Sequence, residues 1–307
     1  MTMFTSLSAR LAIACLAIFP MASHAQEITF HHAQGETLVP LHPKVVATLD
    51  FALLDTLSAL GVEVAGVPNS GLPPYLAKFG SDRYRKVGSL FEPDYEALSA
   101  LAPDLILVGG RSAPKYAQVA KIAPTIDLSP DKNRTLDSSI EYAQELGRVF
   151  GKEAQATARV DKLRQSIAAL RLKTAKAGTG LLVMTSGGRM MALGPDSWFG
   201  MLYRDFGVKP IARQIDDSGP HGQVISSEFI LDTQPDWIYV IDRDAAVGET
   251  GASAKQLLDN EVIRQSKAWK AGHVVYLDPV NWYIVLYGLT SLQTMVDELD
   301  HALPSAQ

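Results

Sequence analysis

The chain has 307 residues, with 33 acidic against 28 basic side chains and a formal charge of −5. An acidic balance argues against a nucleic-acid partner, which would call for a basic surface. The length suits two lobes of ordinary domain size, each able to bury its own core.

Residues 1–25 have the pattern of an export signal. Arg10 supplies the positive charge, residues 11–19 form an apolar run too short to span a membrane, and Ser23 and Ala25 provide the small residues of a cleavage site. Cleavage after Ala25 would place a mature chain of 282 residues in the periplasm. It would also remove Cys15, the single cysteine. The mature chain could then form no disulfide and would have no thiolate metal ligand and no cysteine nucleophile. Lipidation of Cys15 is the alternative, although only four residues separate it from Arg10.

Short apolar runs alternate with helical patterns, as in βαβ units built around parallel sheets. We therefore predict an α/β protein with two Rossmann-like lobes, at 26–136 and 178–307. Strands are expected in the first lobe at 45–48, 62–67, 105–108 and 125–127, with a helix at 51–60. Strands are expected in the second lobe at 180–184, 237–241 and 274–276, with helices at 199–206, 227–232 and 290–302.

The segment 137–177 between these lobes lacks proline and repeats apolar residues at helical spacing. A single helix of this length would span roughly 55–60 Å, longer than one compact lobe. We predict one helix that bridges the two lobes. Two consecutive surface helices broken at Gly151 are the alternative, because glycine is unfavourable inside a helix.

An internal echo relates the two lobes. The stretch from Glu96 to Arg111 aligns without gaps on the stretch from Glu228 to Arg243, at an offset of 132 residues. In both, a Glu precedes a Pro-Asp turn by seven residues, an apolar strand follows, and an Arg comes eight residues after the Pro. Ligands of α/β sheets bind at the carboxyl ends of the strands. Arg111 and Arg243 are thus expected to meet an anion in a cleft between the lobes, where guanidinium groups make planar, charge-assisted bonds.

His221 and Tyr283 are two further candidates on loops. His221 lies in a glycine-flanked loop before a helix, and Tyr283 follows a strand across a proline turn. Alone, each is as well explained by exposure or packing. Together they suggest a site for Fe(III), a hard ion matched by phenolate oxygen and accessible to imidazole. A siderophore with only two bidentate groups leaves two iron positions that one His and one Tyr can fill.

The chain resembles periplasmic ferric-siderophore-binding proteins of ABC importers, in particular the catecholate, enterobactin-type branch. The resemblance covers nearly the whole chain after residue 25. In the second lobe it rests on Gly194-Pro-Asp-Ser-Trp-Phe-Gly200, His221-Gly-Gln-Val-Ile-Ser-Ser-Glu-Phe-Ile230, Val240-Ile-Asp-Arg243, Gln256-Leu-Leu-Asp-Asn260, Tyr276-Leu-Asp-Pro279 and Trp282-Tyr283. In the first lobe it rests on Gly88-Ser-Leu-Phe-Glu-Pro-Asp-Tyr-Glu96 and Gly109-Gly-Arg111.

The resemblance implies the class III binding-protein fold, in which one long helix joins the lobes, and a role for each candidate. It places the iron ligands at His221 and Tyr283, and two of three arginines around the anionic complex at Arg111 and Arg243. At the position of the third arginine this chain has Trp198. Two alternatives stay open: Trp198 stacks on a catechol ring, or the nearby Arg189 replaces the missing charge.

The resemblance also implies an importer. Glu96 and Glu228 fall where related proteins dock onto arginines of the membrane permease, and ordinary solvated helix acids are the alternative. We expect a monomer with no intrinsic cofactor, which carries Fe(III) only as a siderophore complex.

Two other functions stay open at this point. One keeps the fold and binds haem, cobalamin or another metal chelate. The other is an exported hydrolase, which the sequence does not favour because it lacks the nucleophile-elbow, phosphate-loop, zinc-protease and dinucleotide motifs.

Overall fold

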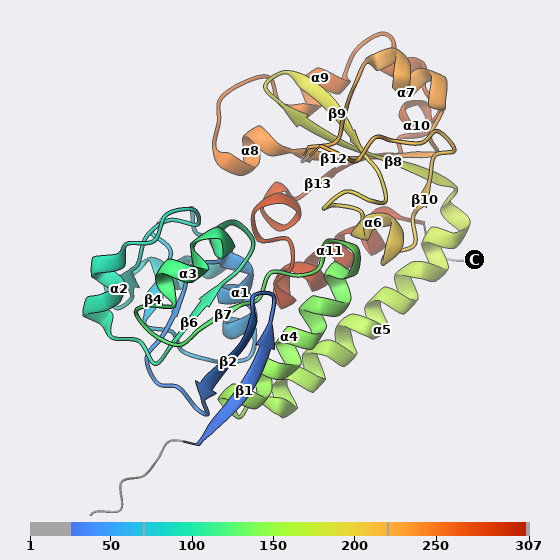
Figure 1. The fold of residues 1–307 in the computed structure, drawn as a ribbon. Helices are drawn as coiled ribbons and strands as arrows, with labels where there is room; N and C mark the ends of the chain where they lie inside the picture. The colour runs from blue at the N-terminus through green and yellow to red at the C-terminus, as the bar shows by residue number, and fades with distance from the viewer. Residues whose placement is uncertain (1–25, 70, 220, 305–307) are drawn as a thin grey trace, which may run out of the picture.

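The computed structural model describes residues 26–69, 71–219 and 221–304. The predicted export signal and Cys15 lie outside these residues. Figure 1 shows two lobes, with the first lobe in blue to teal and the second in yellow to orange, joined by a layer of helices. No helix in the described ranges is long and apolar enough to cross a membrane.

The first lobe is built on a parallel sheet. Its strand order is β5 (Arg85–Lys86), β4 (Gly66–Val67), β3 (Val46–Thr48), β6 (Leu105–Val108) and β7 (Thr125–Asp127). Its helices are α1 (Phe51–Ala59), α2 (Tyr95–Leu101) and α3 (Tyr116–Val119), with short 3₁₀ turns η1 (Pro74–Gly80), η2 (Gly110–Lys115) and η3 (Lys132–Arg134). An antiparallel hairpin of β1 (Glu27–His32) and β2 (Gly35–Pro40) packs beside β7.

The second lobe contains a mixed sheet. Its strand order is β11 (Gln223–Ile225), β9 (Arg189–Leu193), β8 (Thr179–Ser186), β12 (Trp237–Asp242) and β13 (Val274–Leu277), with β10 (Lys209–Pro210) paired to the start of β8. Its helices are α6 (Met201–Arg204), α7 (Ser227–Thr233), α8 (Arg243–Val247), α9 (Ala254–Leu258), η4 (Ile263–Gln265) and α10 (Lys267–Ala271). Only β9 runs antiparallel to its neighbours, β8 and β11.

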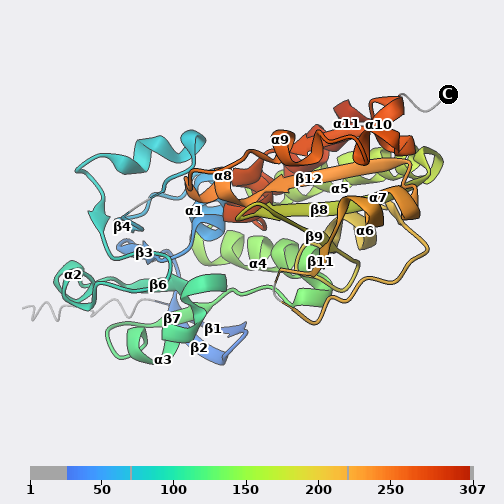
Figure 2. The same cartoon turned by 90° about the horizontal axis from the view of Figure 1, so that it is seen from above.

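The segment 137–177 is not the single helix that we predicted. It contains most of α4 (Thr135–Phe150) and all of α5 (Glu153–Ala177), which pack side by side as a hairpin (Figures 1 and 2). The break is at Gly151, whose φ of 63° lies in the left-handed region that glycine adopts at little cost. Lys152 N donates to the Gly147 carbonyl over 2.7 Å and closes the turn. The long helix that joins the lobes is therefore α5 alone, roughly 37 Å in length.

The chain after β13 returns to the first lobe. A π-helical turn, η5 (Val280–Val285), leads to α11 (Leu289–Ala302), which packs on both α1 and α5. Ser291 N donates to Asp55 Oδ2 of α1 over 2.9 Å, and Leu289 N donates to Thr56 Oγ1 over 3.3 Å. The region 178–307 is consequently not one compact lobe, because its last helix belongs to the layer between the lobes.

The echo in the sequence corresponds to a repeated local structure. Asp104, before β6, accepts a hydrogen bond from Val45 N over 2.8 Å at the entry to the neighbouring β3. Asp236, before β12, accepts one from Thr179 N over 2.7 Å at the entry to the neighbouring β8. Each Pro-Asp turn therefore ties the start of its strand to the next strand. This repeated unit places Arg111 and Arg243 at equivalent positions beyond β6 and β12.

The core occupies both faces of each sheet. In β8, Leu182 and Met184 face a large cluster that runs through the helix layer into the first lobe, whereas Leu181 and Val183 face a smaller cluster under α7 and α9. This alternation is typical of a sheet that is covered on both sides. It leaves the strand ends, with their loops, as the free surfaces where the lobes face each other.

Candidate functional site

A pocket of about 790 Å³ lies between the lobes, at the carboxyl ends of the strands. Most of its exposed wall is apolar. From the first lobe and the following loop it is lined by Ala33, Gln34, Phe91, Gly110, Arg111, Ala113, Pro114, Asp127, Ser129 and Pro130. From the second lobe and the returning segment it is lined by Trp198, Phe199, His221, Arg243, Tyr283, Leu286 and Tyr287. Five of the predicted site residues, Arg111, Trp198, His221, Arg243 and Tyr283, thus surround one pocket.

Arg111 reaches across the pocket from the first lobe. Its Nη2 donates to the Tyr283 carbonyl over 2.8 Å, and its Nη1 donates to the Ile284 carbonyl over 3.1 Å. The chain before it can pass close to the returning segment only as glycine: a Cβ on Gly110, which has a φ of 49°, would lie 2.7 Å from the Tyr287 hydroxyl. Arg111 therefore holds the turn that carries Tyr283.

Tyr283 lies in η5, where Leu286 N donates to the Asn281 carbonyl over 2.9 Å. The turn ends at Leu286, with φ 62° and ψ −59°, values of a rare, strained γ-turn. Such strain is concentrated at functional sites, as are π-helical turns. The local backbone is thus shaped to present Tyr283 to the pocket rather than to continue a helix.

Two guanidinium groups lie close to the Tyr283 ring. Arg111 Cζ is 5.5 Å from the ring centroid and Arg243 Cζ is 5.9 Å from it, within the range of cation–π attraction. Arg243 Nε also donates to the phenol oxygen over 3.2 Å. Phe199 stacks on the ring at 6.1 Å between centroids. This arrangement places two positive charges within about 6 Å of the ring centroid of Tyr283.

Arg243 is the first residue of α8, and its side chain contacts two acidic side chains and a serine. Its Nη1 lies 3.3 Å from Asp244 Oδ1, from Glu249 Oε2 and from Ser186 Oγ. The hydrogen bond to Tyr283, together with Glu249, raises the pKa of the Arg243 guanidinium. Arg243 thus stays charged and points at the phenol oxygen.

The pocket is also bordered by exposed aromatic side chains. Trp198 from the second lobe is 40% exposed, and Phe91 from the first lobe is 63% exposed. Exposed aromatic rings on facing walls are suited to stacking on a planar aromatic ligand. His221 is exposed in the loop before β11 and lines the same pocket.

Arg189 does not line this pocket. It is the first residue of β9 and borders a smaller hollow of about 380 Å³, which shares His221 and Arg243 with the main pocket. The structure thus places Arg189 beside the predicted site, in a hollow that adjoins the main pocket at His221 and Arg243.

Comparison with known proteins identifies the family. A family model described as periplasmic binding protein matches residues 46–280. This chain is a member of the periplasmic binding protein family. The predicted family is therefore confirmed, and its members are binding proteins of the extracytoplasmic space.

Several members of the family are close relatives. The chain is 40% identical over 283 residues to the petrobactin-binding protein YclQ of Bacillus subtilis. This alignment covers 91% of this chain and 89% of YclQ. It is 33% identical over 278 residues to the ferric-anguibactin-binding protein FatB of Vibrio anguillarum, with 89% of this chain and 86% of FatB covered.

Solved structures confirm the predicted fold. The crystal structure of YclQ superposes with a TM-score of 0.86 over 90% of this chain and 98% of that one. The catecholate-siderophore-binding protein VctP of Vibrio cholerae, 32% identical, superposes with a TM-score of 0.85 over 90% of this chain and all of that one. The two-lobed α/β architecture with a long helix between the lobes is thus that of the family.

Within this binding protein, Glu96 and Glu228 occupy equivalent exposed positions in the first turns of α2 and α7. Hydrogen bonds from its own backbone N–H and from Ser226 lower the pKa of Glu228. Because each helix runs antiparallel to the strand that follows it, both acids lie on the side of the strand ends that face the pocket. They remain candidates for docking, one on each lobe.

Sequence reasoning missed a hydrogen-bonded pair in which Tyr287 lines the pocket and Asp50 is buried behind it. Tyr287 donates its hydroxyl to Asp50 Oδ2 over 2.8 Å, and Asp50 Oδ1 accepts from Ala52 N and Leu53 N at the start of α1. Burial raises the pKa of Asp50 to about 6, against the lowering effect of its hydrogen bonds and of Arg111. The pair joins the returning segment to the first lobe, and no local pattern could predict a contact between residues 237 positions apart.

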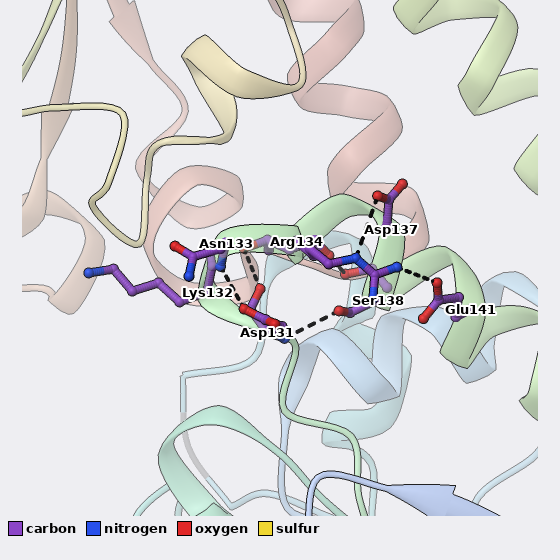
Figure 3. A network of polar contacts seen from close by, with 9 residues as sticks. Asp131, Lys132, Asn133, Arg134, Asp137, Ser138 and Glu141 are labelled. Carbon is purple, nitrogen blue, oxygen red and sulfur yellow. Dashed lines mark hydrogen bonds and ion pairs between the residues drawn. The ribbon is translucent and has the colours of Figure 1, made fainter.

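A polar network also fixes the chain just beyond the pocket wall at Pro130 (Figure 3). It consists of Asp131, Asn133, Arg134, Asp137, Ser138 and Glu141. Arg134 lies between Asp137 and Glu141 and donates to Glu141 Oε1 over 2.6 Å. From the second lobe, Arg204 Nη2 donates to the Lys132 carbonyl over 2.8 Å. The η3 turn that leads into α4 is thereby tied to the second lobe.

Proposed function

We propose that this binding protein captures a ferric siderophore in the interlobe pocket and delivers it to the membrane permease of an ABC importer. The proposed cargo is a ferric complex of the catecholate type whose chelator is tetradentate and leaves two iron positions open. His221 and Tyr283 fill these positions. The proposal includes export to the periplasm with cleavage after Ala25, function as a monomer, and no enzymatic turnover.

The observation that carries the proposal is the setting of Tyr283. Tyr283 lines the same pocket as His221, its oxygen receives a hydrogen bond from Arg243, and Arg111 lies over its ring. Fe(III) prefers anionic oxygen donors, and a catecholate complex of Fe(III) carries net negative charge. Two arginines around one phenol therefore suit both the iron ligand and the anionic complex that it binds.

The wall of the pocket supports an aromatic cargo. Trp198 and Phe91 present exposed rings, and Pro114, Pro130 and Leu286 add apolar surface. The relatives named above bind petrobactin, ferric anguibactin and a catecholate siderophore, which supports the same class of cargo for this chain. Glu96 and Glu228 are the proposed contacts with the permease.

Equilibrium titration distinguishes this cargo from the other chelates that such a fold can hold. The protein is titrated with ferric bis-catecholate, haem and cobalamin, and binding is followed by quenching of tryptophan fluorescence. Trp198 lines the pocket, so a bound ferric complex is expected to quench it. The variant Trp198→Phe serves as the control that assigns the signal.

The expected result is saturable binding of the ferric complex at far lower concentration than of haem or cobalamin. Tighter binding of haem or cobalamin would contradict the proposed cargo. Catalytic release of chelator fragments from the complex would contradict the role of a binding protein.

A further inference from the structure

A second hollow opens beside the iron-facing residues. It has a volume of about 380 Å³ and shares His221 and Arg243 with the interlobe pocket. Its remaining wall consists of Ser186, Arg189, Met191, Gly219, Gly222 and Val224. A ligand whose metal centre lies at His221 can therefore extend a substituent into this hollow without leaving the protein.

Arg189 is held beside the hollow by a tight hairpin. Gly187 and Gly188, with φ values of 55° and 70°, form the two-residue turn between β8 and β9, and Arg189 pairs with Ser186 across it. Gly187 N donates to Asp244 Oδ2 over 2.7 Å. The turn is thus anchored to the residue that follows Arg243.

The two arginines of the hollow differ in how their charge is balanced. Arg243 is paired with Asp244 and Glu249. In the part of the chain that the structure describes, no acidic side chain forms an ion pair with Arg189. An exposed guanidinium without an acidic partner, on the wall of a hollow that also contains Ser186, is suited to an anion from outside the protein.

We infer that this hollow is a subsite for a carboxylate on the chelator, separate from the groups that bind iron. The inference rests on the proposed function, since it needs the metal centre at His221. Arg189 is the residue that contacts the carboxylate, and its planar fork matches the two oxygens. Ser186 Oγ, which already lies 3.3 Å from Arg243 Nη1, offers a further donor. The carboxylate belongs to the linker, because the catecholate oxygens are occupied by iron.

The test uses two ferric bis-catecholate complexes that differ at one position. The linker of one chelator carries a free carboxylate, and the linker of the other carries the corresponding carboxamide. Dissociation constants are measured by fluorescence titration for the wild type, for Arg189→Gln, and for Arg164→Gln as the control. Arg164 is exposed on α5, so its variant removes one positive charge from the helix layer instead of from the hollow.

The wild type should bind the carboxylate complex more tightly, by roughly 10- to 100-fold, the effect of one or two charge-assisted hydrogen bonds. Arg189→Gln should abolish this preference and bind the carboxamide complex like the wild type, whereas Arg164→Gln should keep the preference. Equal affinities of the wild type for the two complexes, or an equal loss for both in Arg189→Gln, would overturn the subsite. Failure of the wild type to bind either complex would instead contradict the proposed function.

Discussion

Replacing Asp50 with Asn is expected to change how the stability of this protein depends on pH. Asp50 is buried at the back of the pocket, where it caps α1 and accepts a hydrogen bond from Tyr287. Asn keeps a side-chain oxygen that can accept from Ala52 N and Leu53 N, and it is as good an N-cap as Asp. The substitution therefore removes the titratable group and preserves the cap.

The magnitude follows from the pKa of Asp50, which burial raises from 3.8 to about 6. Between these pH values the folded protein holds a proton that the unfolded chain has released. Its stabilising effect is complete below pH 3.8 and is lost as the pH rises through 6, so the free energy of unfolding falls over this range. A pKa difference of this size corresponds to about 3 kcal/mol.

Urea unfolding of both proteins at pH 4, 5, 6 and 7 measures this effect. The free energy of unfolding of Asp50→Asn should rise relative to the wild type by up to about 3 kcal/mol between pH 4 and pH 7. Burial also raises the pKa values of Asp55 and Asp205 to about 6. These residues titrate in both proteins, so their contributions cancel in the difference between the two free energies of unfolding. Parallel stability curves would refute the reasoning, because they would mean that Asp50 titrates alike in the folded and unfolded states.

Three further predictions concern binding and delivery. Arg243→Ala should weaken binding of tetradentate and hexadentate ferric complexes alike and make binding less sensitive to salt, and an unchanged salt dependence in titrations at several ionic strengths would contradict this. Trp198→Ala and Phe91→Ala should each weaken the binding of aromatic ferric chelates by about 2- to 12-fold and leave the binding of an aliphatic ferric chelate unchanged, as measured by competition titration. Glu96→Ala and Glu228→Ala should keep the ligand affinity of the isolated protein and lower iron uptake by vesicles that contain the importer. A loss of affinity in these two variants would show that they act at the pocket.

The buried strands could be predicted from the sequence, whereas the bounds of the segments between them could not. β6 and β7 match the predicted strands at 105–108 and 125–127, because continuous apolar runs bounded by turns identify buried parallel strands. The segment 62–67 contains only the two-residue strand β4, since strand length depends on the pairing partners. The helix breaks at Gly151 because this residue adopts a left-handed backbone conformation. Apolar residues at helical spacing continue on both sides of it, and this spacing led us to predict one helix.

From the residues alone, only the part of the site that lies in the internal repeat could be predicted. The echo indicated that Arg111 and Arg243 follow equivalent strands, and the structure places both beside one pocket. The π-helical turn at Tyr283 depends on a hydrogen bond to the carbonyl five residues back and on a strained Leu286, neither of which apolar periodicity can indicate. The hairpin of Gly187 and Gly188 before Arg189 has the glycine signal of a tight turn, and this signal was available in the sequence.

Direct ligation of iron by Tyr283 is the central claim, and one comparison of affinities tests it. Tyr283→Phe keeps the ring that stacks on Phe199 and the backbone carbonyl that Arg111 binds, and it removes only the oxygen. A tetradentate ferric catecholate needs that oxygen, whereas a hexadentate one already fills the coordination sphere of the metal. The ratio of the variant and wild-type dissociation constants should therefore be at least about tenfold larger for the tetradentate complex than for the hexadentate one. Equal ratios for the two complexes would contradict the account.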